Sequence, residues 1–336
     1  MYIFKSSLAT FVAVLGCLLN ALPVTGALVP RDDAGDVESS TTVYQFPNPT
    51  WLENLAVRSN GEILVTVINP ADLYKVDVRR TPATATLLYS FTGLNTTTGI
   101  TEVTPDVFAV VVGNYSLATG TVTPRSFSVW EVDLRSHEPA ISKIADLPEA
   151  ALLNGMTTLS SRKGTILISD SGLGVVWRLN TRTGEYAVVL DDKTTRPVPE
   201  AELQIGINGI RRLRDYLYFV NLGRALFCRV RIDLQTGTAI GPYEIIATGL
   251  VGDDFDITKD GTAYVTGVIS NVVWRVTPDG TVTVVAGNLT GPTSAQFGRT
   301  KDKNTLYVVT SGAMITPDPI NVTFAEGGKV VALETD

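Results

Sequence analysis

The sequence predicts an all-β fold, a six-bladed β-propeller closed by an N-terminal strand that pairs in the last blade. Three observations support this prediction. Helical periodicity is almost absent after residue 40, one pattern of short β-rich runs recurs along the chain, and its copies begin about 40–55 residues apart. Neither end of the array resembles a polar capping repeat, so a closed ring is favoured over an open solenoid.

Each copy of the pattern has a turn with glycine, an apolar strand, and a further strand that ends on a polar residue. The six copies span residues 53–77, 99–133, 154–180, 208–233, 253–277 and 292–333. Residues 41–46 alternate like a strand and precede the first copy. We expect them to pair as the outer strand of the last blade, which removes an exposed sheet edge.

Composition limits the class of protein. The chain has 336 residues, of which 44% are hydrophobic, and a net charge of −7. This is enough apolar material for a large core and argues against disorder. An acidic chain without a clustered basic face is a poor nucleic-acid binder. We expect a monomer that acts on an apolar small molecule.

The N-terminus has the pattern of a secretory signal. Lys5 precedes an apolar run over residues 8–22, and small residues follow at 24–26. We expect cleavage after Gly26, with an uncleaved anchor as the alternative. No later apolar run approaches the ~20 residues that a membrane span needs. The predicted division is a signal peptide over 1–26, a flexible lead-in over 27–40 and the propeller over 41–336.

Four N-glycosylation sequons agree with export. They begin at Asn95, Asn114, Asn288 and Asn321. Of the two cysteines, Cys17 leaves with the signal, so Cys228 has no partner within the mature chain. Because Cys228 stands in a strand pattern, we expect a buried, inert thiol.

Candidate chemistry lies at the heads of the blades. In a propeller the first residues of the innermost strands gather at one mouth of the central channel. Those positions hold Glu53, Asn154, Asn208 and Asp253. Two carboxylates and two carboxamides form the all-oxygen set that suits Ca²⁺. The alternative is that Asn-Gly and Asp-Asp are ordinary turn residues. No strand-glycine-helix motif for phosphates occurs, so we expect no organic cofactor.

The chain contains one histidine, His137, in a polar loop. This excludes Ser-His-Asp and Cys-His triads unless His137 itself is the base, and it excludes zinc sites with several imidazoles.

The pattern resembles the calcium-dependent propellers of the SMP-30/gluconolactonase and diisopropylfluorophosphatase type over roughly residues 41–333. Glu53, Asn154, Asn208 and Asp253 match the ligand order of that group, and the phrases at 153–156, 168–170 and 207–210 add to the likeness. The resemblance implies a central Ca²⁺ and a lactonase in which Asp253 is base or nucleophile, with Asp254 raising its pKa. Residues 293–297 lack the histidine that many phosphotriesterase-like members place near the channel.

Three phrases, at 51–58, 105–110 and 306–312, resemble secreted propellers of fungal secondary metabolism. Some of these are hetero-Diels-Alderases that join a tropolone o-quinone methide to a humulene-type sesquiterpene. The resemblance implies an apolar pocket that orients both reactants and excludes water. The candidate pocket residues are Trp51, Phe108, Met156, Phe255 and Phe297, with Asn154, Asn208 and Gln296 as donors. Some of these side chains are alternatively core residues.

Three functional hypotheses follow. The first is a secreted cycloaddition enzyme, the second is a Ca²⁺-dependent lactonase or related hydrolase, and the third is a non-catalytic binding propeller. The apolar blade heads and the single histidine favour the first.

Overall fold

The computed structural model describes residues 40–201, 204–317 and 320–335. Every regular element in this part of the chain is a β-strand, so the prediction of an all-β, propeller-like fold is confirmed. The predicted signal peptide and residues 27–39 of the lead-in lie outside the described residues. A search of the described residues for a helix capable of crossing a membrane finds none.

Four antiparallel sheets have four strands each within the described residues. They comprise β12 (Leu153–Ser160), β13 (Thr165–Asp170), β14 (Val175–Asn180) and β15 (Tyr186–Asp191); β16 (Ile207–Leu213), β17 (Tyr216–Asn221), β18 (Leu226–Ile232) and β19 (Ala239–Thr248); β20 (Phe255–Ile257), β21 (Ala263–Gly267), β22 (Val272–Val276) and β23 (Val282–Ala286); and β24 (Pro292–Phe297), β25 (Thr305–Thr310), β28 (Lys329–Glu334) and β1 (Ser40–Gln45).

An eight-stranded sheet contains two further four-stranded units, joined through the pair Ile68↔Thr96. The units are β2 (Trp51–Val57), β3 (Ile63–Ile68), β4 (Asp72–Asp77) and β5 (Thr84–Ser90), and β6 (Thr96–Thr104), β7 (Val107–Gly113), β10 (Ser128–Asp133) and β11 (Ala140–Asp146). Two short hairpins are inserted, β8 (Tyr115–Ser116) with β9 (Thr121–Val122) and β26 (Ala313–Pro317) with β27 (Ile320–Phe324).

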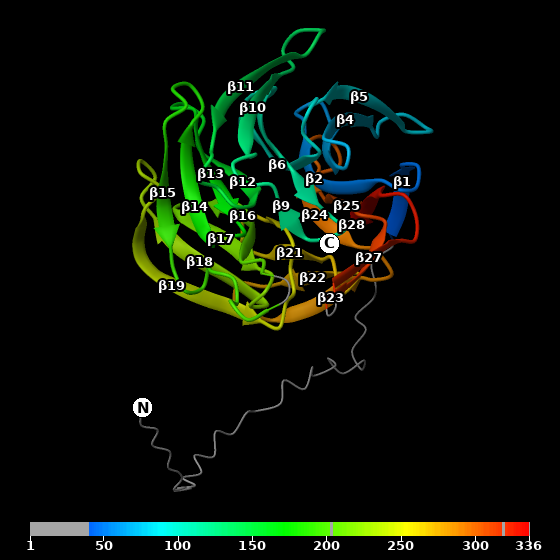
Figure 1. Ribbon diagram of the computed structural model, residues 1–336. Helices are drawn as coiled ribbons and strands as arrows, with labels where there is room; N and C mark the ends of the chain where they lie inside the picture. The colour runs from blue at the N-terminus through cyan, green and yellow to red at the C-terminus, as the bar shows by residue number, and fades with distance from the viewer. Residues whose placement is uncertain (1–39, 202–203, 318–319, 336) are drawn as a thin grey trace, which may run out of the picture. The chain divides into compact units, whose positions relative to one another are not determined.

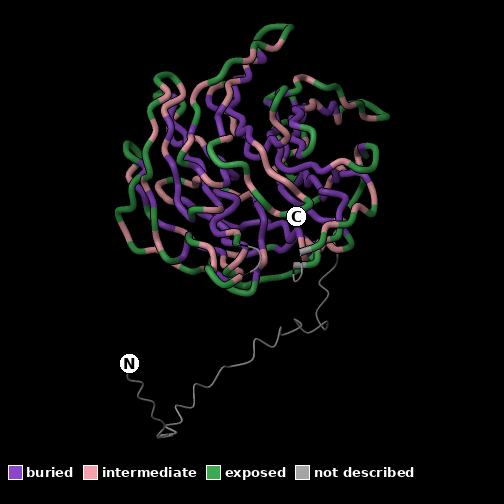
Figure 2. The backbone as a smooth tube through the Cα atoms, viewed as in Figure 1, coloured by how far each residue is buried: buried purple, intermediate pink, exposed green. Residues whose placement is uncertain are grey.

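The first strand of each unit is the innermost one. In chain order β2, β6, β12, β16, β20 and β24 each contact the next, and β24 contacts β2. Figure 1 shows the sheets side by side within this part of the chain. Outer strands such as β5, β11 and β23 contain both exposed and partly or fully buried positions, whereas β3, β7 and β13 are buried throughout (Figure 2). Strand β1 pairs antiparallel with β28 at the edge of its sheet.

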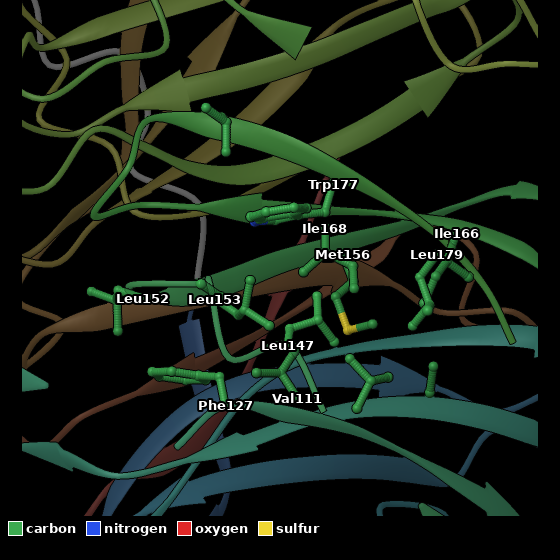
Figure 3. Packing of buried hydrophobic residues seen from close by; sticks show 14 of the residues in the cluster. Val111, Phe127, Leu147, Leu152, Leu153, Met156, Ile166, Ile168, Trp177 and Leu179 are labelled. Atoms are coloured by element: carbon green, nitrogen blue, oxygen red, sulfur yellow. The ribbon is translucent and has the colours of Figure 1, made fainter. Parts of the chain in front are cut away.

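Hydrophobic cores fill the spaces between neighbouring units. One core joins Val111 of β7 to Met156 of β12 and Trp177 of β14 (Figure 3). Another joins Phe227 of β18 to Trp274 of β22. Both tryptophans therefore pack between units. Burying each large apolar side chain contributes roughly 1.5–3 kcal/mol.

Hydroxyl groups on the first or second strand of one unit bond to the inner strand of the next unit. Each donates to a backbone carbonyl oxygen of the next unit, at 2.6–2.9 Å. The donor–acceptor pairs are Thr66–Thr98, Thr98–Leu153, Ser169–Asn208, Thr266–Thr293 and Thr293–Leu52. Because these carbonyls are buried, each bond removes the cost of an unsatisfied acceptor.

Glycine permits the closest approach between inner strands. A Cβ on Gly155 would lie 2.6 Å from the carbonyl oxygen of Asn208, and one on Gly209 would lie 2.5 Å from the Cα of Asp254. Both glycines lie inside strands and neither has a positive φ. The interpretation of Asn-Gly as ordinary turn chemistry is therefore wrong at these positions; the glycine makes room for the next strand.

Gly209→Ala is expected to destabilise the protein by about 1–3 kcal/mol, because the methyl group meets backbone that cannot move away cheaply. Urea unfolding measures the loss. Gly287→Ala is the matched control, since a Cβ there has nothing within 4 Å and Gly287 has no positive φ. Equal stability of the two variants would contradict this account of the inner strands.

Cys228 lies fully buried on β18, and burial raises the pKa of its thiol to about 12. The thiol therefore stays protonated at pH 8, where an ordinary thiol with a pKa near 8.5 is partly ionised. In a Cys17→Ser background, we expect no labelling by an aromatic disulfide reagent in native buffer and complete labelling in guanidinium. Rapid native labelling would show that the β18 core opens readily.

Candidate functional site

Polar side chains from several units meet in one cavity at the centre of the inner strands, here called the inner cavity. Its volume is about 80 Å³. The polar floor consists of Glu53 from β2, Thr98 from β6, Asn154 from β12, Asn208 from β16 and Asp253, two residues before β20. The structure thus brings together all four predicted metal ligands.

β-Bulges aim these side chains toward the centre. On β2, β12 and β16 the pairing register shifts between Leu52 and Leu55, between Leu153 and Met156, and between Ile207 and Ile210. Each inner strand advances three residues while its partner advances two, so one extra residue is inserted beside Glu53, Asn154 or Asn208. An extra residue interrupts the strict alternation of strand side chains and redirects the polar one.

Hydrogen bonds fix the two carboxylates of the floor. Trp51 Nε1 donates to Glu53 Oε2 at 2.6 Å, and Asn208 Nδ2 donates to Asp253 Oδ1 at 2.5 Å. Each carboxylate keeps its second oxygen free of such bonds among the described residues. Both groups are therefore positioned and still have acceptor capacity facing the cavity.

The floor holds two acidic side chains, Glu53 and Asp253, without a cation beside them. Burial raises the pKa of Glu53 to about 7; the Trp51 hydrogen bond opposes this shift and the Asp254 charge adds to it. Burial also raises the pKa of Asp253 well above its usual range, assisted by the charges of Glu53 and Asp254. No lysine or arginine lines the inner cavity in the described part of the chain.

The floor fits a hard cation by its donor chemistry. Oxygens of two carboxylates and two carboxamides are the ligands that Ca²⁺ prefers, and a cation would offset the buried negative charge. Within residues 40–201, 204–317 and 320–335, however, no group of three or more His, Cys, Asp or Glu side chains is arranged as a metal cluster. Any ion here would depend on the two amides.

The wall of the inner cavity is apolar. It includes Trp51, Ile68, Leu117, Leu222, Val268 and Val322, which belong to a single hydrophobic cluster. Leu152, another wall residue, is held by its backbone, because the Asp170 carboxylate accepts hydrogen bonds from the Ala151 and Leu152 amides at 2.9 Å. An apolar ligand can bury its surface here while its polar end meets the floor.

A larger cavity of about 300 Å³, the outer chamber, shares part of this wall. Trp51, Ile68, Tyr115, Leu117 and Val322 line both spaces. Phe324 adds an edge-on contact with Trp51, with ring centroids 6.4 Å apart. The two spaces therefore meet at a common boundary of mostly apolar side chains.

The structure places only part of the predicted substrate pocket at this site. Trp51 lines it, whereas Met156 lies in the core between units with Leu147 and Leu153 (Figure 3). Phe255 is buried in an equivalent core, and Phe108 stands on the second strand of its unit, away from the centre. The inserted bulge residue explains why Met156 lies in the core. It shifts the alternation of side chains along β12, so that Met156 faces the core although Asn154 faces the cavity.

Gln296 and Phe297 lie at the far end of β24 from the polar floor. Gln296 Oε1 accepts a hydrogen bond from the Val57 amide at 2.7 Å, and Phe297 packs edge-on against Tyr264. Neither residue lines the inner cavity. The Gln296 side chain joins the ends of the inner strands β2 and β24, and the Phe297 ring packs against the second strand β21.

Sequence reasoning missed Tyr115, Thr98 and most of the wall. Ile68, Leu222 and Val268 stand at or just beyond the ends of strands β3, β17 and β21. Apolar residues where a polar turn is expected are the signal that could have identified them.

The four sequon asparagines differ in exposure. Asn288 and Asn321 are exposed, whereas Asn95 and Asn114 are half-buried. Asn95 also lines the outer chamber. Glycosylation at all four remains a prediction.

Comparison with known proteins finds relatives that match most of the chain. A protein of Phoma sp. named "putative hetero-Diels-Alderase" is 33% identical over 315 residues, which cover 83% of this chain and 88% of the relative. A protein of Sarocladium schorii named "putative hetero-Diels-Alderase asR5" is 31% identical, covering 89% of this chain and 87% of the relative. No protein-family model matches the chain.

Solved structures share the fold at low identity. The calcium-binding protein regucalcin of Agrobacterium tumefaciens has a TM-score of 0.62 at 14% identity, covering 89% of this chain and 96% of that one. A gluconolactonase of Xanthomonas campestris has a TM-score of 0.58 at 13% identity, covering 89% of this chain and 90% of that one.

The two sequence relatives establish the family of the chain, because each is more than 30% identical to it over more than four-fifths of both chains. The chain belongs to their family, the hetero-Diels-Alderases.

Proposed function

We propose that the protein catalyses a hetero-Diels–Alder cycloaddition at the boundary of the inner cavity and the outer chamber. The observation that carries this proposal is an apolar wall placed above a polar floor, in a chain of this family. The reactants are a tropolone o-quinone methide and a humulene-type sesquiterpene. One C–C bond and one C–O bond form between heterodiene and alkene to give a dihydropyran, and no atom is lost and no oxidant is needed.

In this proposal, most of the rate acceleration comes from orienting the reactants and excluding water. The wall around Trp51 and Val322 holds the alkene against the heterodiene, so two reactants behave as one molecule. The same surface keeps water from the reactive methide. The amide N–H groups of Asn154 and Asn208, and Asp253 in the protonated form that its raised pKa favours, donate hydrogen bonds to the oxygen on which electron density grows. His137 has no part in this scheme, because it is exposed on the β10–β11 loop beside Glu138.

The propeller in this proposal has six blades. Support comes from the inner strands, of which β24 follows β20 and contacts β2 again. Strand β1 closes the ring as the outer strand of the last blade, next to β28.

We also propose that residues 1–26 direct secretion. The mature chain then acts as a monomer on small molecules and carries glycans at its sequons.

Filling the wall tests the site. Val322→Trp is expected to reduce the rate over the buffer reaction by about 100-fold, since a displaced reactant loses its productive orientation. The dihydropyran is measured by liquid chromatography with the methide generated in place. Val282→Trp is the matched control, because Val282 is an exposed valine on β23. Full activity of Val322→Trp would contradict the proposed site.

A second candidate function, a Ca²⁺-dependent lactonase, is favoured by the meeting of Glu53, Asn154, Asn208 and Asp253. These four residues would hold the ion. Bound Ca²⁺ would supply positive charge that polarises an ester carbonyl. Asp253 is the side chain available to act as base, while the paired Asp254 is committed to Arg211 at 3.0 Å.

Calcium binding is tested by calorimetry and thermal melting of chelator-treated protein. If the floor holds Ca²⁺, an excess of 100 times Kd stabilises the fold by about 2.7 kcal/mol. Asp253→Asn should remove this gain, whereas Asp279→Asn, in an exposed turn, should retain it. Absence of binding heat together with an unchanged melting temperature would eliminate the calcium site and with it the lactonase.

A further inference from the structure

Tyr115 lies where the inner cavity and the outer chamber meet. It begins β8, in the hairpin inserted between β7 and β10, and its side chain lines both spaces. Its side chain also packs against the core that contains Phe127 and Leu147. The phenol is thus half-buried, with its ring supported on one side and its remaining surface toward the cavities.

Two asparagines hold the backbone at this position. The Tyr115 amide donates to Asn95 Oδ1 at 2.8 Å, and the Asn95 amide donates to Asn114 Oδ1 at 2.9 Å. These bonds fix the start of β8 against the loop before β6. A side chain on such a fixed backbone loses little further freedom when a ligand binds it.

The Tyr115 hydroxyl has no hydrogen-bond partner among the described residues, although it lies near the polar floor. Burial, followed by the charges of Glu53 and Asp253, raises its pKa to about 12. The hydroxyl is therefore within electrostatic range of both carboxylates and stays a donor at neutral pH.

Several other donors of the inner cavity already make hydrogen bonds within the protein. Trp51 Nε1 donates to Glu53, and the Thr98 hydroxyl donates to the Leu153 carbonyl oxygen at 2.8 Å. Asn208 Nδ2 uses one of its two N–H groups on Asp253. Of the uncharged side chains that line the cavity in the described residues, Tyr115 and Asn154 keep donors without any such bond.

We infer that the Tyr115 hydroxyl donates a hydrogen bond to the carbonyl oxygen of a conjugated ketone bound at the boundary of the two cavities. The inference rests on the proposed function and adds the residue that orients its heterodiene. The oxygen faces Tyr115 and the polar floor, and the hydrocarbon partner occupies the outer chamber. A donor at this oxygen also stabilises the electron density that develops there as the C–O bond forms.

The test compares two seven-membered-ring probes, tropolone and cycloheptatriene, by calorimetry. Tropolone carries the carbonyl oxygen and cycloheptatriene lacks it. We expect Tyr115→Phe to weaken tropolone binding about tenfold and to leave cycloheptatriene binding unchanged. Tyr186→Phe is the matched control, because it also removes one hydroxyl, which donates to Glu149 outside both cavities.

Three results would overturn the inference: equal tropolone affinity in Tyr115→Phe and the unmodified protein, a parallel loss of both probes, or no preference for tropolone in the unmodified protein. A parallel loss would assign Tyr115 a purely structural role. Failure of the proposed cycloaddition can be distinguished from failure of this inference. In that case the unmodified protein would not accelerate the reaction, but it would still bind tropolone in a way that depends on Tyr115.

Discussion

Close packing of the inner strands is the constraint on which the rest of this structure depends. Strands from six units converge, so at some positions their backbones approach too closely to leave space for a side chain. The same close approach leaves no room for water to satisfy buried carbonyl groups. Gly155 and Gly209 permit the close approach, because they have no side chain. Hydroxyls such as those of Thr66 and Ser169 satisfy buried carbonyl oxygens of the next unit by donating hydrogen bonds to them.

The same convergence produces the site. Bulges that relieve the crowding turn Glu53, Asn154 and Asn208 inward, where they meet Asp253. Two neighbouring carboxylates then have different roles. Asp254 accepts hydrogen bonds from Arg211, Asn54 and Ser294 and ties three inner strands together. Asp253 lacks a cation and faces the cavity, which makes it available for a ligand at a cost in stability.

The all-β fold and the four carboxylate and amide residues of the polar floor were predictable because both follow the repeat: equivalent positions in a periodic sequence occupy equivalent places in space. The substrate pocket was less predictable. Strict alternation along an inner strand would place Met156 with Asn154, but the bulge returns Met156 to the core. Tyr115 belongs to one of the two inserted hairpins, which interrupt the repeated pattern, so the repeat could not locate it.

The central claim is that an apolar molecule binds above the polar floor with its oxygen directed toward it. A crystal structure with a stable dihydropyran analogue of the product tests this most directly. The account predicts a ligand between Trp51 and Val322, its ring oxygen facing Asn154 and Asn208 and its hydrocarbon part in the outer chamber. A ligand bound elsewhere, or one bound with its oxygen toward the apolar wall, would contradict it.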